Sequence, residues 1–299
     1  MMGLFSRFFG QTGSDDQHSA LTANPKIEKS LSLQVLFDGQ FRLQSKKMTD
    51  ALRSYHYSMS ATRCEIDSAL AEEGTIIGLV GWGKHVVRLV GFNLPMPAEP
   101  VESCIAPSHY PKKLKNRARA HSSHVLLYYV GYVKSPHEQY VALASVAGAL
   151  SQLGAIVVLN EDACTSFPAA ALSGADISGD IVELLRTLPL LVLYCGFVKY
   201  EVEGTSGVWM RTYGAHLLAL PDFAVYASDH EEGQKYFDIF ENIFSYLWES
   251  DAQLKAGHTM QVGTTEYLRF RKRTKKEYFL DSEGELLVVE IIGPDEINA

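Results

Sequence analysis

The spacing of apolar side chains changes twice between residues 119 and 161, and the change predicts a strand, a helix and a second strand. Residues 124–130 form an unbroken β-prone run, which is typical of a strand that is covered on both faces. Four apolar residues then recur at steps of three and four, which predicts a helix with one apolar stripe: Tyr140, Leu143, Ala147 and Leu150. Residues 155–159 supply the second strand. A strand–helix–strand unit normally makes a right-handed crossover between parallel neighbours, although the sequence of this unit does not exclude an antiparallel strand between them.

The start of this helix is marked twice. Ser135 and Glu138 have the spacing of a capping box, and Pro136 stands at the first helical position. Gly154 supplies a left-handed end. We therefore expect the helix to begin at Ser135 or Pro136.

Other segments show similar patterns. Residues 75–80 and 85–90 predict a hairpin, residues 190–202 form a long β-rich run, and residues 236–248 predict a helix with a broad aromatic face that must be covered. A loop at residues 173–176 separates two sets of strands and helices. These patterns predict an α+β protein of two packed lobes, each a mixed β-sheet covered by amphipathic helices. The expected division is a flexible leader at residues 1–30, a first lobe at 31–175 and a second lobe at 176–299.

Composition limits the possible functions. The 299 residues are 46% hydrophobic, and the formal net charge of −8 with a pI near 5.7 makes this an acidic protein. An acidic protein repels nucleic acids and anionic membranes, so we expect no nucleic-acid partner and favour a basic protein partner. Two basic runs, at residues 112–119 and 269–276, are the only sequence support for nucleic-acid binding, which ranks third among the functions considered.

Three further features of the sequence lead to expectations about the cellular setting of the protein. No run reaches the ~20 apolar residues of a transmembrane helix, and no signal peptide is visible, which predicts a cytoplasmic protein. Four cysteines lie far apart without a CxxC pair, as expected for free thiols in a reducing compartment. Residues 2–9 form a short aromatic segment that could make a weak contact with a membrane surface or a partner.

Candidate site residues come from two places beside the first strand–helix–strand unit. His121 and His124 precede or begin the strand, but a spacing of three sends their side chains to opposite faces if both lie on it, so we expect no metal site. Glu161, Asp162 and Cys164 follow the carboxyl end of the second strand, where α/β proteins often bind ligands. No catalytic motif accompanies them, and no cofactor is expected.

Part of the second lobe resembles the bacterial family called domain of unknown function 4261, over about residues 190–263. The resemblance rests on residues 210–214 (MRTYG), 220–223 (LPDF), the aromatic helix at 236–248, and residues 255–261 (KAGHTMQ). It implies a bacterial cytoplasmic protein of α+β type and carries over no catalytic residue. A toxin-neutralising or secretion-accessory role is one form of function that the resemblance suggests.

Two functions are therefore expected from the sequence. The first is a non-enzymatic protein-binding module. The alternative is an enzyme of unknown reaction with a pocket near His121, His124, Glu161 and Asp162.

Arg211 is a further binding candidate. Strand alternation places it on one face with Trp209 and Tyr213, where it either stacks on an aromatic ring and pairs with a carboxylate such as Asp222, or faces a cleft and binds an anionic group.

Overall fold

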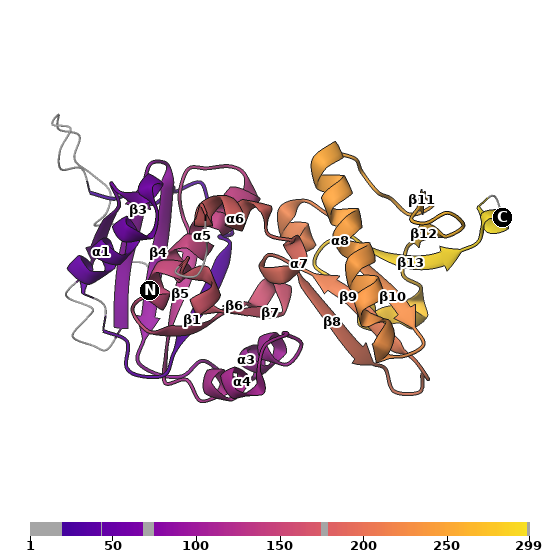
Figure 1. The fold of residues 1–299 in the computed structure, drawn as a ribbon, viewed down its shortest axis with the longest axis horizontal. Helices are drawn as coiled ribbons and strands as arrows, with labels where there is room; N and C mark the ends of the chain where they lie inside the picture. The colour runs from indigo at the N-terminus through magenta and orange to yellow at the C-terminus, as the bar shows by residue number, and fades with distance from the viewer. Residues whose placement is uncertain (1–19, 43, 68–74, 175–178, 298–299) are drawn as a thin grey trace.

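The computed structural model of the protein describes residues 20–42, 44–67, 75–174 and 179–297. It has two lobes, each with one β-sheet and helices packed against it, and short helices join the two lobes (Figure 1). The aromatic segment at residues 2–9, for which a membrane or partner contact is expected, lies outside the described residues. No helix in the described part of the chain is both long and apolar enough to cross a membrane.

The first sheet has seven strands in the order β2-β3-β4-β5-β1-β6-β7. Their bounds are β1 (Ser32–Phe37), β2 (Arg63–Ile66), β3 (Thr75–Trp82), β4 (His85–Phe92), β5 (Ser123–Tyr129), β6 (Ala155–Asn160) and β7 (Thr165–Pro168). Every neighbouring pair is antiparallel. The two strands of the predicted strand–helix–strand unit, β5 and β6, are parallel to each other but not adjacent, because β1 lies between them.

Helices cover both faces of this sheet. On one face lie α1 (Ser45–Tyr55) and α5 (Pro136–Ser151), and on the other lie α3 (Ala98–Ile105) and α4 (Lys112–Arg119) (Figure 1). The predicted start of α5 is confirmed, since the Ser135 hydroxyl accepts a bond from the Glu138 N–H at 3.4 Å. Residues 140–150 of α5 are buried on all sides, because the sheet, α1 and the second lobe surround this helix.

The second sheet has six strands in the order β11-β12-β13-β10-β9-β8, and only the β10–β13 pair is parallel. The strands are β8 (Gly196–Glu201), β9 (Val208–Tyr213), β10 (Asp222–Ala227), β11 (Thr259–Gln261), β12 (Tyr267–Arg271) and β13 (Leu286–Ile292). Helix α8 (Gly233–Ser250) covers one face, with the Phe240 and Phe244 rings 5.7 and 5.2 Å from the Phe223 ring. The predicted α+β fold with two lobes is confirmed. The first sheet is antiparallel rather than mixed, because β1 lies between the parallel strands β5 and β6, and only the second sheet is mixed as predicted.

Between the sheets, α6 (Ile181–Thr187) and α7 (Leu190–Leu193) connect the lobes. Residues 190–193 were predicted as part of a strand but form a helical turn. The reason is long-range, because the Glu241 carboxylate of α8 accepts the N–H groups of Leu190 and Leu191, both at 3.1 Å. Tertiary contacts thus override the β-prone side chains.

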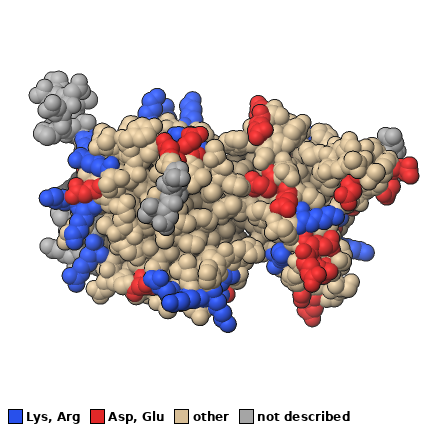
Figure 2. Space-filling view, in the orientation of Figure 1, with Lys and Arg blue, Asp and Glu red and all other residues tan. Residues whose placement is uncertain are grey.

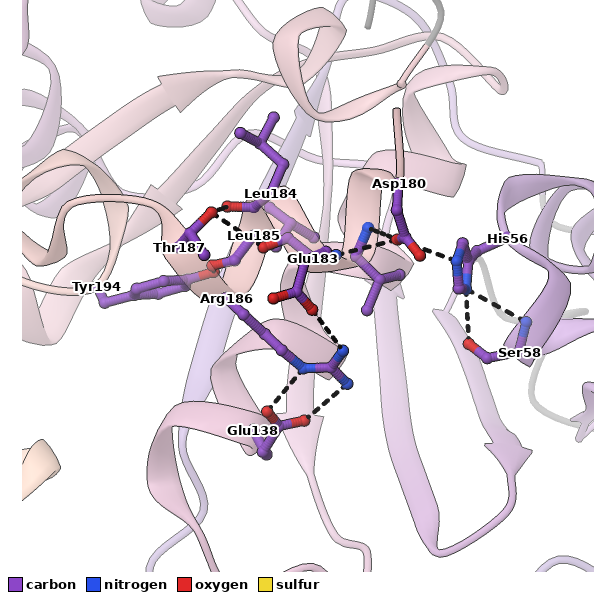
Figure 3. Close-up of polar contacts among 11 residues, drawn as sticks. His56, Ser58, Glu138, Asp180, Glu183, Leu184, Leu185, Arg186, Thr187 and Tyr194 are labelled. Carbon is purple, nitrogen blue, oxygen red and sulfur yellow. Dashed lines mark hydrogen bonds and ion pairs between the residues drawn. The ribbon is translucent and has the colours of Figure 1, made fainter. Parts of the chain in front are cut away.

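Helix α6 is bound to the first lobe through polar contacts (Figure 3). The Arg186 guanidinium donates two bonds to the Glu138 carboxylate of α5, at 2.8 and 3.2 Å. At the other end of α6, the Asp180 side chain caps the helix and lies 3.0 Å from the His56 ring. The Tyr194 hydroxyl, at the end of α7, donates to the Leu185 carbonyl at 2.7 Å.

One apolar core runs through both lobes, since α5, α7, α8 and strands of both sheets contribute to a single buried cluster. Residues 20–30, predicted as part of a flexible leader, also pack on the body of the protein. Leu21 is buried and its N–H binds the Glu65 carboxylate at 3.0 Å, while Lys29 reaches the second lobe and pairs with Glu283 at 2.8 Å.

Short 3₁₀ turns connect several of these elements: η2 (Tyr57–Met59), η3 (Glu161–Ala163), η4 (Ala169–Leu172), η5 (Ala215–Leu218), η6 (His230–Glu232), η7 (Lys275–Leu280) and η8 (Pro294–Glu296).

Candidate functional site

The two histidines lie together on the face of the first sheet that α3 and α4 cover. His121 precedes β5 rather than belonging to it, so strand alternation does not separate the rings, whose centroids are 6.5 Å apart. The His121 ring is occupied on both nitrogens: Nε2 accepts from the Met96 N–H at 2.8 Å, and Nδ1 donates to the Ala118 carbonyl at 2.7 Å. His124 Nδ1 donates to the Leu94 carbonyl at 2.8 Å.

These bonds give the histidines a structural role. Both are buried, and burial lowers the pKa of each, so both are neutral near pH 7. They fix the extended connector at residues 94–97 against the start of β5. Within the described residues, no group of three or more His, Cys, Asp or Glu side chains has the geometry to hold a metal ion.

Glu161 and Asp162 lie at the opposite end of this sheet. On β1, Leu36 is opposite His124, and Gln34 is opposite Leu159 on the other side. Glu161 is therefore about four residues, or roughly 13 Å, along the sheet from His124, with two strand spacings, roughly 10 Å, between them. The predicted pocket that combines both histidines with both carboxylates does not form.

Glu161, Asp162 and Cys164 instead face the junction between the lobes. Ala163 packs so closely on the second lobe that a Cβ at Gly196 would lie 1.7 Å from its carbonyl oxygen. Partial removal of water raises the pKa of both carboxyls and of the Cys164 thiol. A thiol with a raised pKa is protonated near pH 7, which argues against a nucleophilic role for Cys164.

Arg211 lies on β9, the strand next to the edge strand β8, and is 1% exposed. Its guanidinium carbon is 4.0 Å from the centroid of the Tyr213 ring, so the stacking expected from strand alternation is present. Nε donates to the Thr212 carbonyl at 3.3 Å and Nη1 to the Asp281 carbonyl at 3.2 Å. Among the described residues, Nη2 has no hydrogen-bond partner.

Asp222 makes a different set of bonds from the one expected. Its Oδ1 accepts from the Thr212 hydroxyl at 2.9 Å and from the Ala215 N–H at 3.3 Å, while Oδ2 lies 3.6 Å from His216 Nδ1. The predicted direct ion pair with Arg211 is replaced by the backbone bonds described above. Arg211 still acts on Asp222 through space: burial raises the pKa of Asp222, and the nearby guanidinium opposes that rise.

A surface groove lies between α8 and β11, with a volume of about 600 Å³. Ile239, Asn242 and Tyr246 line it from α8, and residues 258–262 line it from β11. The Tyr246 ring is 51% exposed and Val262 is 40% exposed, so water reaches apolar surface on both walls. A groove of this size falls in the range that proteins use to bind ligands.

Residues 211–290 match the family model of the domain of unknown function, DUF4261. The resemblance expected from the sequence is confirmed, and the match begins inside β9 and extends to residue 290 in β13. No curated protein and no solved structure gave a significant match to the chain.

The DUF4261 segment contains Arg211, Asp222 and all residues that line the groove, whereas His121, His124, Glu161 and Asp162 lie outside it. Sequence reasoning missed the groove. A usable signal was present, because residues 257–263 carry mainly polar side chains and are bounded by glycines, as in an edge strand.

Proposed function

We propose that this protein is a non-enzymatic protein-binding module that binds a basic partner through its second lobe. The observation that carries the proposal is the groove between α8 and β11 on a strongly acidic lobe. Exposed apolar walls within a polar surround are typical of an interaction site.

The charge of the chain is divided unequally. Residues 1–175 contain 16 Lys or Arg and 14 Asp or Glu, a formal charge of +2, whereas residues 176–299 contain 11 and 21, a formal charge of −10. Figure 2 shows basic side chains along the outer and lower edges of the first lobe and acidic side chains spread over the second. A field of this sign attracts a basic partner to the second lobe and speeds association.

Three parts of the proposal extend beyond binding itself. Four free cysteines, Cys64, Cys104, Cys164 and Cys195, support a reducing compartment, and we assign the protein to the bacterial cytoplasm on this ground and on the DUF4261 match. A toxin-neutralising or secretion-accessory role is one form that partner binding can take. The enzyme alternative is not carried forward, because its four residues lie at opposite ends of the first sheet.

The test is affinity purification from a native lysate with the full chain and two matched variants. Tyr246→Ala removes an exposed ring from the groove, and Tyr278→Ala removes a ring that is 72% exposed and outside the groove. We expect the wild type and Tyr278→Ala to retain one stoichiometric basic protein at moderate salt, and Tyr246→Ala to lose it. Absence of a stoichiometric partner, or equal retention by all three proteins, counts against the proposal.

A further inference from the structure

Strand β11 ends the second sheet, and its free edge forms one wall of the groove. In an antiparallel pair, opposite residues alternate between hydrogen-bonded and non-bonded positions. The bonds of Val262 N–H to the Glu266 carbonyl and of Phe270 N–H to the His258 carbonyl fix this alternation. Residues 258, 260 and 262 therefore bond to β12, and the backbone groups of Thr259 and Gln261 point outward.

These outward groups have no backbone partner within the described residues, since no strand there lies beyond β11. A free edge of this kind pairs readily with another extended chain. Such a chain would lie about 4.8 Å beyond β11, within the groove and beside α8. Helix α8 would then supply apolar contacts through Ile239 and Tyr246, which are two turns apart on one face.

We infer that β11 accepts an extended segment of a partner protein as an added strand, with apolar side chains at every second position and basic side chains between them. The apolar positions face α8 and the face of the sheet on which Met260 packs against the core. The basic positions are favoured by the −10 charge of residues 176–299. The inference rests on the proposed function and specifies its ligand class and its mode of binding.

Two features define the length of the site. At one end, Lys235 of α8 lies 3.9 Å from Glu266 in the turn after β11, so this pair links the helix to the hairpin just beyond Val262, the last residue that lines the groove. At the other end, the Gly257 N–H donates to the Phe270 carbonyl, and the Phe270 N–H donates to the His258 carbonyl. Two residues therefore lie opposite one, with Gly257 at φ +92°, and this β-bulge ends the regular pairing of β11 with β12. Only Thr259 and Gln261 offer outward groups between these limits, so the added strand is short.

The first experiment uses a defined heptapeptide of alternating lysine and valine, titrated into the isotopically labelled full chain and followed by amide hydrogen exchange. We expect slower exchange at the Thr259 and Gln261 amides and no change at Met260 and Val262, which already bond to β12. The same peptide with glutamate in place of lysine should bind at least tenfold more weakly. Equal binding of both peptides, or protection mapped to another surface, overturns the inference.

Backbone methylation of the peptide tests the hydrogen bonds themselves. In an extended chain, valine N–H groups face one side and lysine N–H groups the other. Methylation of one set should weaken binding about tenfold, because the donors that face β11 are lost, while methylation of the other set should leave it unchanged. Two methylated peptides that bind equally well exclude strand addition.

Variants of the protein make the reciprocal test. Gln261→Pro removes an outward donor but no bond to β12, and proline is tolerated at such edge positions. We expect about tenfold weaker peptide binding with an unchanged melting temperature. Loss of the native partner in Tyr246→Ala, together with its full retention in Gln261→Pro, would refute strand addition and leave the proposed function intact. Retention by both variants would refute both.

Discussion

Arg211 provides the most direct test of how the core of the DUF4261 segment is held together. Replacing it with alanine removes two charge-assisted hydrogen bonds and one stacking contact. The two bonds are long, one at the upper limit of the normal range at 3.2 Å and the other just beyond it at 3.3 Å, so each contributes about 1 to 1.5 kcal/mol. The stacking on Tyr213, at 4.0 Å and away from water, contributes about 1 kcal/mol.

We therefore expect Arg211→Ala to lower the free energy of unfolding by about 3 to 4 kcal/mol. Arg211→Lys keeps the charge beside Asp222 but loses the planar fork, so a loss of about 2 kcal/mol is expected. Urea unfolding followed by tryptophan fluorescence measures both. Arg273→Ala is the control, since Arg273 also contacts Asp281 but lies on the surface, where such an ion pair contributes at most about 1 kcal/mol.

The result that refutes this reasoning is unchanged stability in both Arg211 variants. If the same variants also lost the native partner, the unpaired Nη2 would be assigned to ligand binding instead. A loss of stability with normal partner binding supports the structural role.

Three further predictions concern pH and the lobe junction. Arg271 holds the pKa of Glu277 at about 2, below its usual 4.5. The Glu277 carboxylate therefore stabilises the protein fully above about pH 4.5, and this stabilisation is lost as pH falls toward 2. Glu277→Gln should lower the free energy of unfolding in urea by about 2 kcal/mol at pH 7 and by much less at pH 2.5. Burial raises the pKa of Asp222, so the contribution of this residue to stability is expected to fall as pH rises from about 4 through that raised pKa. The difference in unfolding free energy between the wild type and Asp222→Asn should therefore change over this range, and parallel pH profiles of the two proteins would contradict the prediction. Gly196→Ala should destabilise the protein by more than about 2 kcal/mol, because the new Cβ would clash with the Ala163 carbonyl. Calorimetric unfolding measures this loss, and Gly39→Ala is the control with little expected effect, because nothing lies within 4 Å of a Cβ at that position.

Local patterns predicted most of the elements. The α5 start, the hairpin of β3 and β4, and the aromatic face of α8 depend on neighbours in the sequence, and each was read correctly. Residues 190–193 were assigned wrongly because their conformation depends on Glu241, about 50 residues away. The insertion of β1 between β5 and β6 is likewise a long-range choice that periodicity does not encode.

The candidate site was predicted less well than the fold. Arg211 and its stacking partner are two residues apart on one strand, so alternation was enough to place them. Arg211 bonds to backbone carbonyls instead of to Asp222, and one of these carbonyls, that of Asp281, is placed by the packing of η7, which no local pattern reveals. The grouping of His124 with Glu161 was wrong because sequence order does not show which end of a sheet a residue reaches.

The buried cluster that both lobes share has a consequence for any attempt to isolate the matched region. Residues 211–290 begin inside β9 and omit β8, so an excised fragment would expose a new sheet edge. It would also lose α7, whose first two N–H groups bind Glu241, and the α5 surface that covers this end of the core. Within this chain, residues 211–290 therefore depend on a flanking strand and on an apolar surface that lie outside the matched region, so the match marks a segment of the second sheet rather than a unit that folds alone.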